Sequence, residues 1–127
     1  FVGLLAPHLA RKLTSASHGT MPIVAALLGG SLLVVSDALA RVTDGTELLH
    51  VSFDLDAVDP TLAPGVGTPV KGGLDYREAH TIMELISASK RMTSLEVVEV
   101  NPILDERNRS AVLAVELLES AFGKRIL

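Results

Sequence analysis

The sequence predicts an α/β fold built on a parallel β-sheet. From Leu48 to Phe122 the expected elements follow in the order strand, loop, helix, strand, helix. This order describes a β-α-β unit with its following helix, and such units form right-handed crossovers in parallel sheets. The chain has 127 residues, of which 48% are hydrophobic. That is enough for one modest domain with a packed core, and it argues against disorder.

The composition argues against several classes of partner. Aromatic residues make up 3% of the chain and the formal net charge is -4, which argues against a nucleic-acid partner and a membrane-interface belt. The longest apolar run, Ile23 to Val35, contains Gly29-Gly30 and falls short of the about 20 residues that cross a bilayer. Small and acidic partners remain open, and a cationic substrate fits best.

The chain contains no cysteine, so it has neither a disulfide scaffold nor a thiolate metal site. This permits a cytoplasmic enzyme, which we expect. The first residue is Phe1 rather than methionine, and Pro7 and His8 interrupt the first apolar stretch, a pattern that makes a poor signal peptide. A cut or incompletely recorded start is therefore expected.

Two helices are expected before the central strand. Pro22 can occupy the first position of a helix that continues to Leu28, and the two glycines that follow end it. A second helix is expected from Ser36 to about Val42, ended by Thr43-Asp44-Gly45. The central strand then begins near Leu48.

This central strand ends in two acidic residues. Its apolar and polar positions alternate through Val51, Ser52, Phe53, Asp54, Leu55 and Asp56. With a side-chain period of two, Asp54 and Asp56 are predicted to point to the same face, about 7 Å apart. Two carboxylates repel unless a cation lies between them, so this pair indicates a site for a hard divalent metal such as Mg²⁺ or Mn²⁺. A solvated strand end is the alternative interpretation.

A stiff loop follows the aspartates. Asp59-Pro60 requires an extended or turning chain, and the loop from Pro64 to Pro69 contains two prolines and two glycines. Loops of such fixed shape commonly position functional groups. Asp75 and Glu78 then form a capping box that starts a helix. The predicted buried face of this helix consists of Ala79, Ile82, Met83 and Ile86.

Two histidines of this region are interpreted as structural. His50 lies four residues before Asp54, about 13 Å away along an extended strand, and is not expected to share a metal with the aspartates. His80 lies beside the buried face of the helix, where a packing or capping role is favoured.

A second strand is expected from Ser94 to Val100, with Glu99 near its end. A carboxylate there would again meet the ligand-binding edge of the sheet, and an ordinary strand-end charge is the alternative. The last helix is expected from Arg107 to Phe122, with Gly123 as its C-terminal stop. Its predicted inward face consists of Val112, Val115, Leu118 and Phe122.

Several of these segments together resemble the ureohydrolase family. They are Ser52–Pro60, Ala63–Pro69, Gly72-Gly73, Tyr76–Glu78 and Glu99–Pro102. The later strand end, Glu-Val-Asn-Pro followed by Ile-Leu-Asp, is more similar to bacterial-type arginases than to agmatinases. The resemblance covers residues 35–127 of a single partial domain over residues 1–127, while residues 1–34 are divergent. It implies the C-terminal portion of a three-layer α-β-α fold.

The resemblance implies Mn²⁺-dependent hydrolysis of L-arginine to L-ornithine and urea. A binuclear manganese centre would lower the pKa of a bridging water, giving a hydroxide that attacks the guanidinium carbon. Carried over by residue, Asp54 would bridge both metals and Asp56 would complete the second. Glu99 would bind the guanidinium, whose planar two-point geometry matches a carboxylate, and Thr68 would line the pocket.

The resemblance also makes His18 the candidate for proton transfer. Residues 14–22 resemble the family segment in which a serine, glycine and asparagine precede His-Gly-Met-Pro, although Thr20 interrupts the match and Ala16 replaces the asparagine. The pKa range of histidine suits acid–base work near neutral pH. An exposed loop histidine is the alternative interpretation.

The family's remaining metal ligands come from an earlier histidine-bearing glycine motif and an Asp-Ala-His-x-Asp motif, and neither is in this sequence. Two hypotheses follow. The chain is part of an arginase that acts on L-arginine or a similar guanidinium compound, or it is a non-catalytic ureohydrolase-like assembly or regulatory subunit. An agmatinase-type enzyme is a further alternative. The resemblance also implies a homo-oligomer, either a trimer or a hexamer.

Overall fold

The computed structural model describes residues 34, 36–41 and 44–126. The chain divides into two units, residues 1–42 and 43–127. In the first unit residues 36–41 are helical, and Arg41 Nε donates a hydrogen bond of 2.7 Å to Asp37 Oδ2. This agrees with the helix predicted after Ser36. The helix predicted over residues 22–28 lies outside the described residues, and the single domain stays a prediction.

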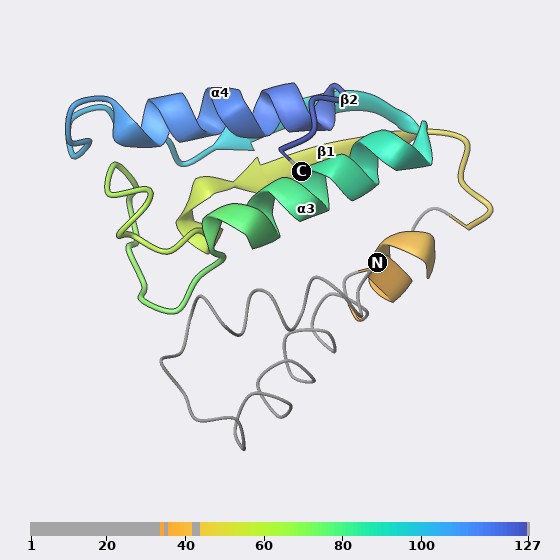
Figure 1. The fold of residues 1–127 in the computed structure, drawn as a ribbon, viewed down its shortest axis with the longest axis horizontal. Coiled ribbons are helices and arrows are strands. Elements are labelled where there is room, and N and C mark those ends of the chain that lie inside the picture. The colour runs from red at the N-terminus through yellow and green to blue at the C-terminus, as the bar shows by residue number, and fades with distance from the viewer. Residues whose placement is uncertain (1–33, 35, 42–43, 127) are drawn as a thin grey trace, which may run out of the picture. The chain divides into compact units, whose positions relative to one another are not determined.

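The second unit has the predicted order of elements. They are β1 (Leu49–Asp54), η1 (Leu55–Ala57), α3 (Tyr76–Ser89), β2 (Met92–Val98) and α4 (Arg109–Ala121). β1 and β2 pair in parallel, with α3 as the connection between them (Figure 1). The predicted α/β fold with a parallel sheet is therefore confirmed.

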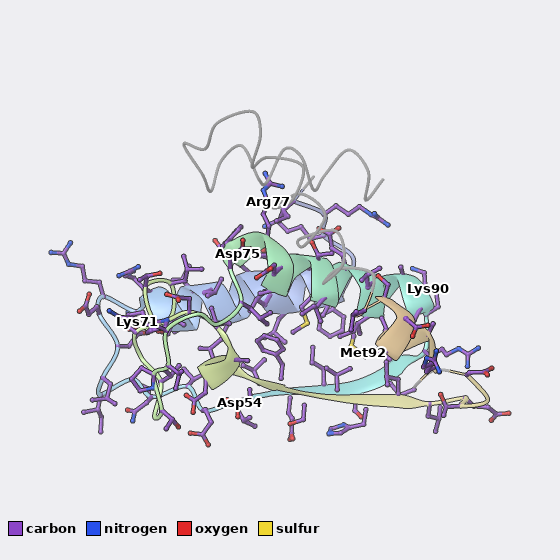
Figure 2. All side chains as sticks on the ribbon, turned by 90° about the horizontal axis from the view of Figure 1, so that it is seen from below. Asp54, Lys71, Asp75, Arg77, Lys90 and Met92 are labelled. Atoms are coloured by element: carbon purple, nitrogen blue, oxygen red, sulfur yellow. The ribbon has the colours of Figure 1, made fainter. Side chains whose placement is uncertain are left out.

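The helices of this unit cover one face of the sheet. Residues along β1 alternate between buried and exposed, so that Leu49, Val51 and Phe53 are buried. Figures 1 and 2 show α3 and α4 side by side on the same side of the strands. Among residues 44–126, no helix covers the opposite face of the sheet. None of the described helices is long and apolar enough to cross a membrane.

β1 ends earlier than the alternating pattern predicts. The strand stops at Asp54, and Asp56 lies in the single 3₁₀ turn η1. Asp54 is the N-cap of this turn, because its Oδ1 accepts a hydrogen bond of 2.9 Å from Asp56 N. The prediction that both aspartates point to one face of a strand is therefore wrong, since the cap bends the chain between them.

α3 begins with the predicted capping box. Asp75 Oδ1 accepts from Glu78 N at 2.7 Å, and Glu78 Oε2 accepts from Asp75 N at 3.0 Å. Each side chain thus satisfies a backbone donor that the first helical turn leaves unpaired. Three residues of the predicted face, Ala79, Met83 and Ile86, are buried, and Ile82 is half-buried.

The predicted inward face of the last helix is wrong at three of its four residues, and the fourth, Leu118, is half-buried. Val112, Val115 and Phe122 are 54%, 57% and 77% exposed. The buried positions of α4 are Ser110, Leu113, Ala114, Leu117, Ser120 and Ala121. Because the helix carries apolar residues on both sides, periodicity alone does not identify the core face. The two buried serines face the core because each has a hydrogen-bond partner there.

One of these serines holds His80 at the contact between α3 and α4. His80 is fully buried, and its Nδ1 forms a hydrogen bond of 2.8 Å with Ser120 Oγ. The Nε2 atom is buried without a hydrogen-bond partner among the described residues. Burial lowers the pKa of His80, as does Lys124, while Glu116 and Glu84 act in the opposite direction. The predicted packing role of His80 is confirmed.

The other buried serine anchors the loop between Pro64 and Pro69. Gly65 N donates a hydrogen bond of 2.7 Å to Ser110 Oγ. A Cβ atom on Gly65 would lie 2.4 Å from Asp105 Cβ, so the loop can rest on Asp105 only because residue 65 is glycine. The Asp105 carboxylate accepts from the amides of Ser110 and Ala111 at 3.0 to 3.2 Å. Asp105 therefore caps α4 and supports the loop.

The electrostatics of Asp105 follow from this cap. Burial by itself raises the pKa of the Asp105 carboxyl, but hydrogen bonds from Ser110 and the amides of Ala111 and Glu106 outweigh it, so the pKa is lowered. Asn108, the N-cap residue, has a left-handed backbone and makes no side-chain capping bond. The ionised Asp105 takes over the role that an N-cap side chain usually has.

The buried His80 predicts an acid-sensitive fold. Its pKa in the folded chain lies below the ordinary value of 6.5, so the unfolded chain takes up the proton first as the pH falls. The free energy of unfolding should therefore decrease as the pH falls from neutral through 6.5. In His80→Gln, which retains a hydrogen-bonding side chain without titrating, this part of the pH dependence should disappear. Urea unfolding at a series of pH values measures both, and identical pH profiles would contradict the assignment.

The Ser110 anchor predicts a specific loss of stability. Ser110→Ala should lower the free energy of unfolding by about 1 to 3 kcal/mol, because the buried Gly65 amide loses its acceptor. Ser52→Ala is the matched control, since Ser52 lies on the exposed face of β1, and it should change stability by less than about 0.5 kcal/mol. Equal effects of the two substitutions in urea unfolding would show that the loop does not depend on Ser110.

Candidate metal and substrate site

The parallel pairing of β1 and β2 brings acidic residues to one edge of the sheet. Asp54 is paired in register with Val98, so Glu99 follows directly after the residue opposite Asp54. Adjacent strands lie about 4.8 Å apart, and the carboxyl ends of parallel strands are where ligands bind. The structure thus places Asp54 and Glu99 on neighbouring strand ends. Figure 2 shows Asp54 at the same end of the unit as Asp75, the N-cap of α3.

Asp56 is held by the loop that follows it. Thr68 Oγ1 donates a hydrogen bond of 2.5 Å to Asp56 Oδ2, and Thr68 N lies 3.3 Å from Asp56 Oδ1. Thr68, predicted to line the substrate pocket, is therefore in direct contact with a candidate metal ligand. Each carboxylate oxygen has two lone pairs, so Asp56 can still bind a cation while these bonds orient it.

Glu99 leaves the sheet with an unusual backbone. β2 ends at Val98 rather than at Val100 as predicted, and Glu99 has a left-handed φ of 63°. Such a conformation is uncommon for a residue other than glycine, and strained residues of this kind cluster at functional sites. The side chain is exposed, and its Oε2 lies 3.2 Å from the position that a Cβ atom on Gly67 would take. Glu99 thus lies against the same loop that holds Asp56.

Asp59 is a fourth acidic residue of this region, which the sequence indicated only as part of a turn with Pro60. Its Oδ1 accepts from Thr61 Oγ1 at 2.7 Å and from Thr61 N at 2.9 Å, while Oδ2 accepts from Gly72 N at 2.9 Å. The hydrogen bonds from Thr61, followed by that from Gly72, lower the pKa of the Asp59 carboxyl. Asp59 closes the base of the loop, and the Asp-Pro turn signal could have indicated this.

Neither of the two described histidines, His50 and His80, has Asp54 or Asp56 as a partner. His18 lies outside the described residues. His50 is exposed on β1, where Nδ1 forms a hydrogen bond of 2.8 Å with Ser94 Oγ and Nε2 lies 3.8 Å from Glu96 Oε1. Over residues 34, 36–41 and 44–126, no group of three or more histidine, aspartate or glutamate side chains is arranged to hold a metal ion.

The described residues therefore have the right type of donor atom for a binuclear metal centre, but they provide too few ligands. The oxygen donors of Asp54 and Asp56 are of the kind that hard divalent cations prefer. Two such ions about 3.5 to 4 Å apart need far more ligands than two carboxylates provide. Asp54 and Asp56 could therefore supply only part of such a ligand set.

A cavity of about 300 Å³ lies elsewhere, between the C-terminal ends of α3 and α4. Lys90, one of its lining residues, is at the opposite end of the unit from Asp54 (Figure 2). Two of its charged groups are engaged, because Lys124 pairs with Glu119 and Glu84 accepts from Ile126 N. The strand ends are therefore the better candidate site.

Comparison with known proteins identifies the family of this chain. Residues 25–123 match the arginase family. The arginase of Bacillus caldovelox is 50% identical over 98 residues, which are 77% of this chain and 33% of that enzyme. Its solved structure superposes with a TM-score of 0.71, covering 75% of this chain and 32% of the other.

Other solved arginases give the same result. The Bacillus subtilis enzyme is 47% identical with a TM-score of 0.71, covering 76% of this chain and 36% of its own. The Entamoeba histolytica arginase in complex with L-ornithine is 28% identical with a TM-score of 0.67, covering 73% and 31%. This chain spans about a third of the length of the relatives that it matches. Since the family match extends over residues 25–123 and includes the strand ends, the loop and both helices of the described unit, the chain belongs to the arginase family.

Proposed function

We propose that this chain forms part of the active site of an arginase-type hydrolase that acts on L-arginine or a similar guanidinium compound. The observation that carries the proposal is the loop between Pro64 and Pro69, which contacts both candidate groups. Thr68 bonds Asp56, and Gly67 adjoins Glu99. A single loop therefore links a carboxylate suited to a metal with one suited to a guanidinium.

Asp54 and Asp56 would supply oxygen ligands to a manganese centre. The family uses a binuclear metal centre, and carboxylates suit hard cations such as Mn²⁺. Thr68 would act on the metal site through Asp56, since both of its hydrogen bonds go to that carboxylate. Partners of this kind fix the orientation of a ligand and are almost as important as the ligand itself.

Glu99 would bind the guanidinium of the substrate. Its carboxylate is exposed at the strand end, and two parallel N–H···O bonds to a guanidinium are among the stronger and more directional contacts in proteins. The sequence also gives the chain a formal charge of -4, which favours approach of a cationic substrate. His18 stays the candidate for proton transfer by resemblance.

The remaining ligands would come from residues beyond those described or from a neighbouring subunit. A homo-oligomer, a trimer or hexamer, located in the cytoplasm is proposed on the same family resemblance. The exposed apolar side chains of Val115 in α4 and of its C-cap residue Phe122 are suitable for contact with further protein. A non-catalytic subunit is the second candidate, favoured by the fact that the described residues alone supply too few metal ligands.

The metal assignment predicts an effect on manganese binding. Asp54→Asn should weaken Mn²⁺ binding by at least about tenfold, because it removes a charged ligand while keeping the oxygen that caps η1. Glu96→Gln is the matched control, since Glu96 is an exposed carboxylate on β2, opposite Ser52, and its ion-pair partner is His50 on β1. The electron paramagnetic resonance signal of free Mn²⁺ measures binding. Equal weakening in both variants would contradict a site at the strand end.

The activity assignment predicts urea release that depends on Asp54. With L-arginine and Mn²⁺, release should fall to background in Asp54→Asn and persist in Glu96→Gln, because only the first substitution touches the proposed site. Complete absence of release from the unchanged chain would contradict a catalytic role for it. Manganese binding that persists in that case would favour the non-catalytic subunit.

A further inference from the structure

A short antiparallel contact fixes the loop against the end of β2. Val66 and Val100 form an antiparallel bridge, and Asn101 N donates a hydrogen bond of 2.8 Å to Gly65 O. In an antiparallel pair the residue after one partner lies opposite the residue before the other. Gly67 is therefore placed directly opposite Glu99.

This register brings the Gly67 backbone and the Glu99 carboxylate together. A Cβ atom on Gly67 would lie 3.2 Å from Glu99 Oε2, closer than an ordinary van der Waals contact between carbon and oxygen. Directly opposed residues in such pairs have Cβ atoms about 4.5 to 5.5 Å apart, so that their side chains interact. With no side chain at residue 67, the Glu99 carboxylate can occupy the space above the loop.

Backbone conformation does not account for glycine at this position. The described glycines with positive φ are Gly45, Gly72 and Gly123, so Gly67 has a backbone that alanine can also adopt. Replacing such a glycine by alanine is commonly neutral or stabilising for the fold. The feature that distinguishes Gly67 is its closeness to Glu99.

We propose that Gly67 is a positioning residue for Glu99, leaving the space that the carboxylate needs in order to meet a guanidinium group at the strand end. This inference rests on the proposed function. The left-handed backbone of Glu99 directs its side chain toward Gly67, and the carboxylate fits there because Gly67 has no side chain. An added methyl group would displace the carboxylate by a few tenths of an ångström, since Glu99 is exposed and free to move away.

The test is a cycle of four chains: the unchanged chain, Gly67→Ala, Glu99→Asp and the double variant. Aspartate is one methylene shorter, so its carboxylate should avoid the new methyl group. Binding of L-arginine in the presence of Mn²⁺ is measured by calorimetry. In the chain that retains Glu99, Gly67→Ala should weaken arginine binding by about tenfold, because small displacements of a positioned group have large effects. It should have little effect in the Glu99→Asp background.

A second readout does not need the ligand. In carbon-13-labelled chain without arginine, Gly67→Ala should shift the resonance of the Glu99 carboxyl carbon. Ser52→Ala is the control, because Ser52 lies on the exposed face of β1 and pairs with Glu96 rather than with the end of β2, and it should leave that resonance unchanged. If the unchanged chain binds no arginine, the proposed function is contradicted, and the carboxyl resonance still decides whether Gly67 positions Glu99.

Two outcomes would overturn the inference. One is that Gly67→Ala lowers the arginine affinity equally in the unchanged chain and in the Glu99→Asp variant. This would mean that Gly67 affects only the loop. The other is a Glu99 carboxyl resonance that does not respond to Gly67→Ala. A coupling between the two positions together with a shifted resonance would support it.

Discussion

The parallel register between β1 and β2 is the constraint on which the candidate site depends. It pairs Asp54 with Val98, so that the acidic turn after one strand and Glu99 after the other meet at the same edge. In an antiparallel pair the carboxyl ends of the two strands would lie at opposite edges. α3 makes the parallel arrangement possible, because it returns the chain to the start of the sheet before β2 begins.

The loop after η1 fixes the positions of the side chains at this shared edge. It is attached to α4 by the buried bond from Gly65 to Ser110, and to the end of β2 by the Val66–Val100 bridge. Two glycines of the loop each leave space for a different acidic residue, because Gly65 packs against Asp105 and Gly67 lies beside Glu99. A loop fixed at both places can orient Asp56 through Thr68 without a metal being bound.

The elements with strong local signals could be predicted from the sequence. The capping box of Asp75 and Glu78 specifies the start of α3, and alternation through Val51 and Phe53 specifies β1. Local side-chain chemistry determines both. The end of β1 could not be placed in this way, because the hydrogen bond from Asp56 N to Asp54 competes with strand geometry and produces η1.

The orientation of α4 shows a different limit. Its apolar residues occur on both sides, so that Val112 and Leu113 are equally suitable for a core by composition. The choice depends on tertiary partners, namely the Gly65 amide for Ser110 and the ring of His80 for Ser120. Polar residues identify the buried face in this helix, because serines with partners can be buried at low cost. No local pattern contains that information, since the partners lie 45 and 40 residues away.

Hydrogen bonds also order the two carboxylates of the proposed metal site. Asp54 is held by the amide of Asp56, and Asp56 is held by Thr68. The two carboxylates are therefore ordered by the protein itself and do not need a metal to set their positions. Ordering ligands in advance lowers the entropy lost on binding, so at the proposed metal site these two would contribute more affinity than two mobile carboxylates. At the proposed site their number would limit how tightly a metal is held, and their hydrogen bonds would determine where it binds.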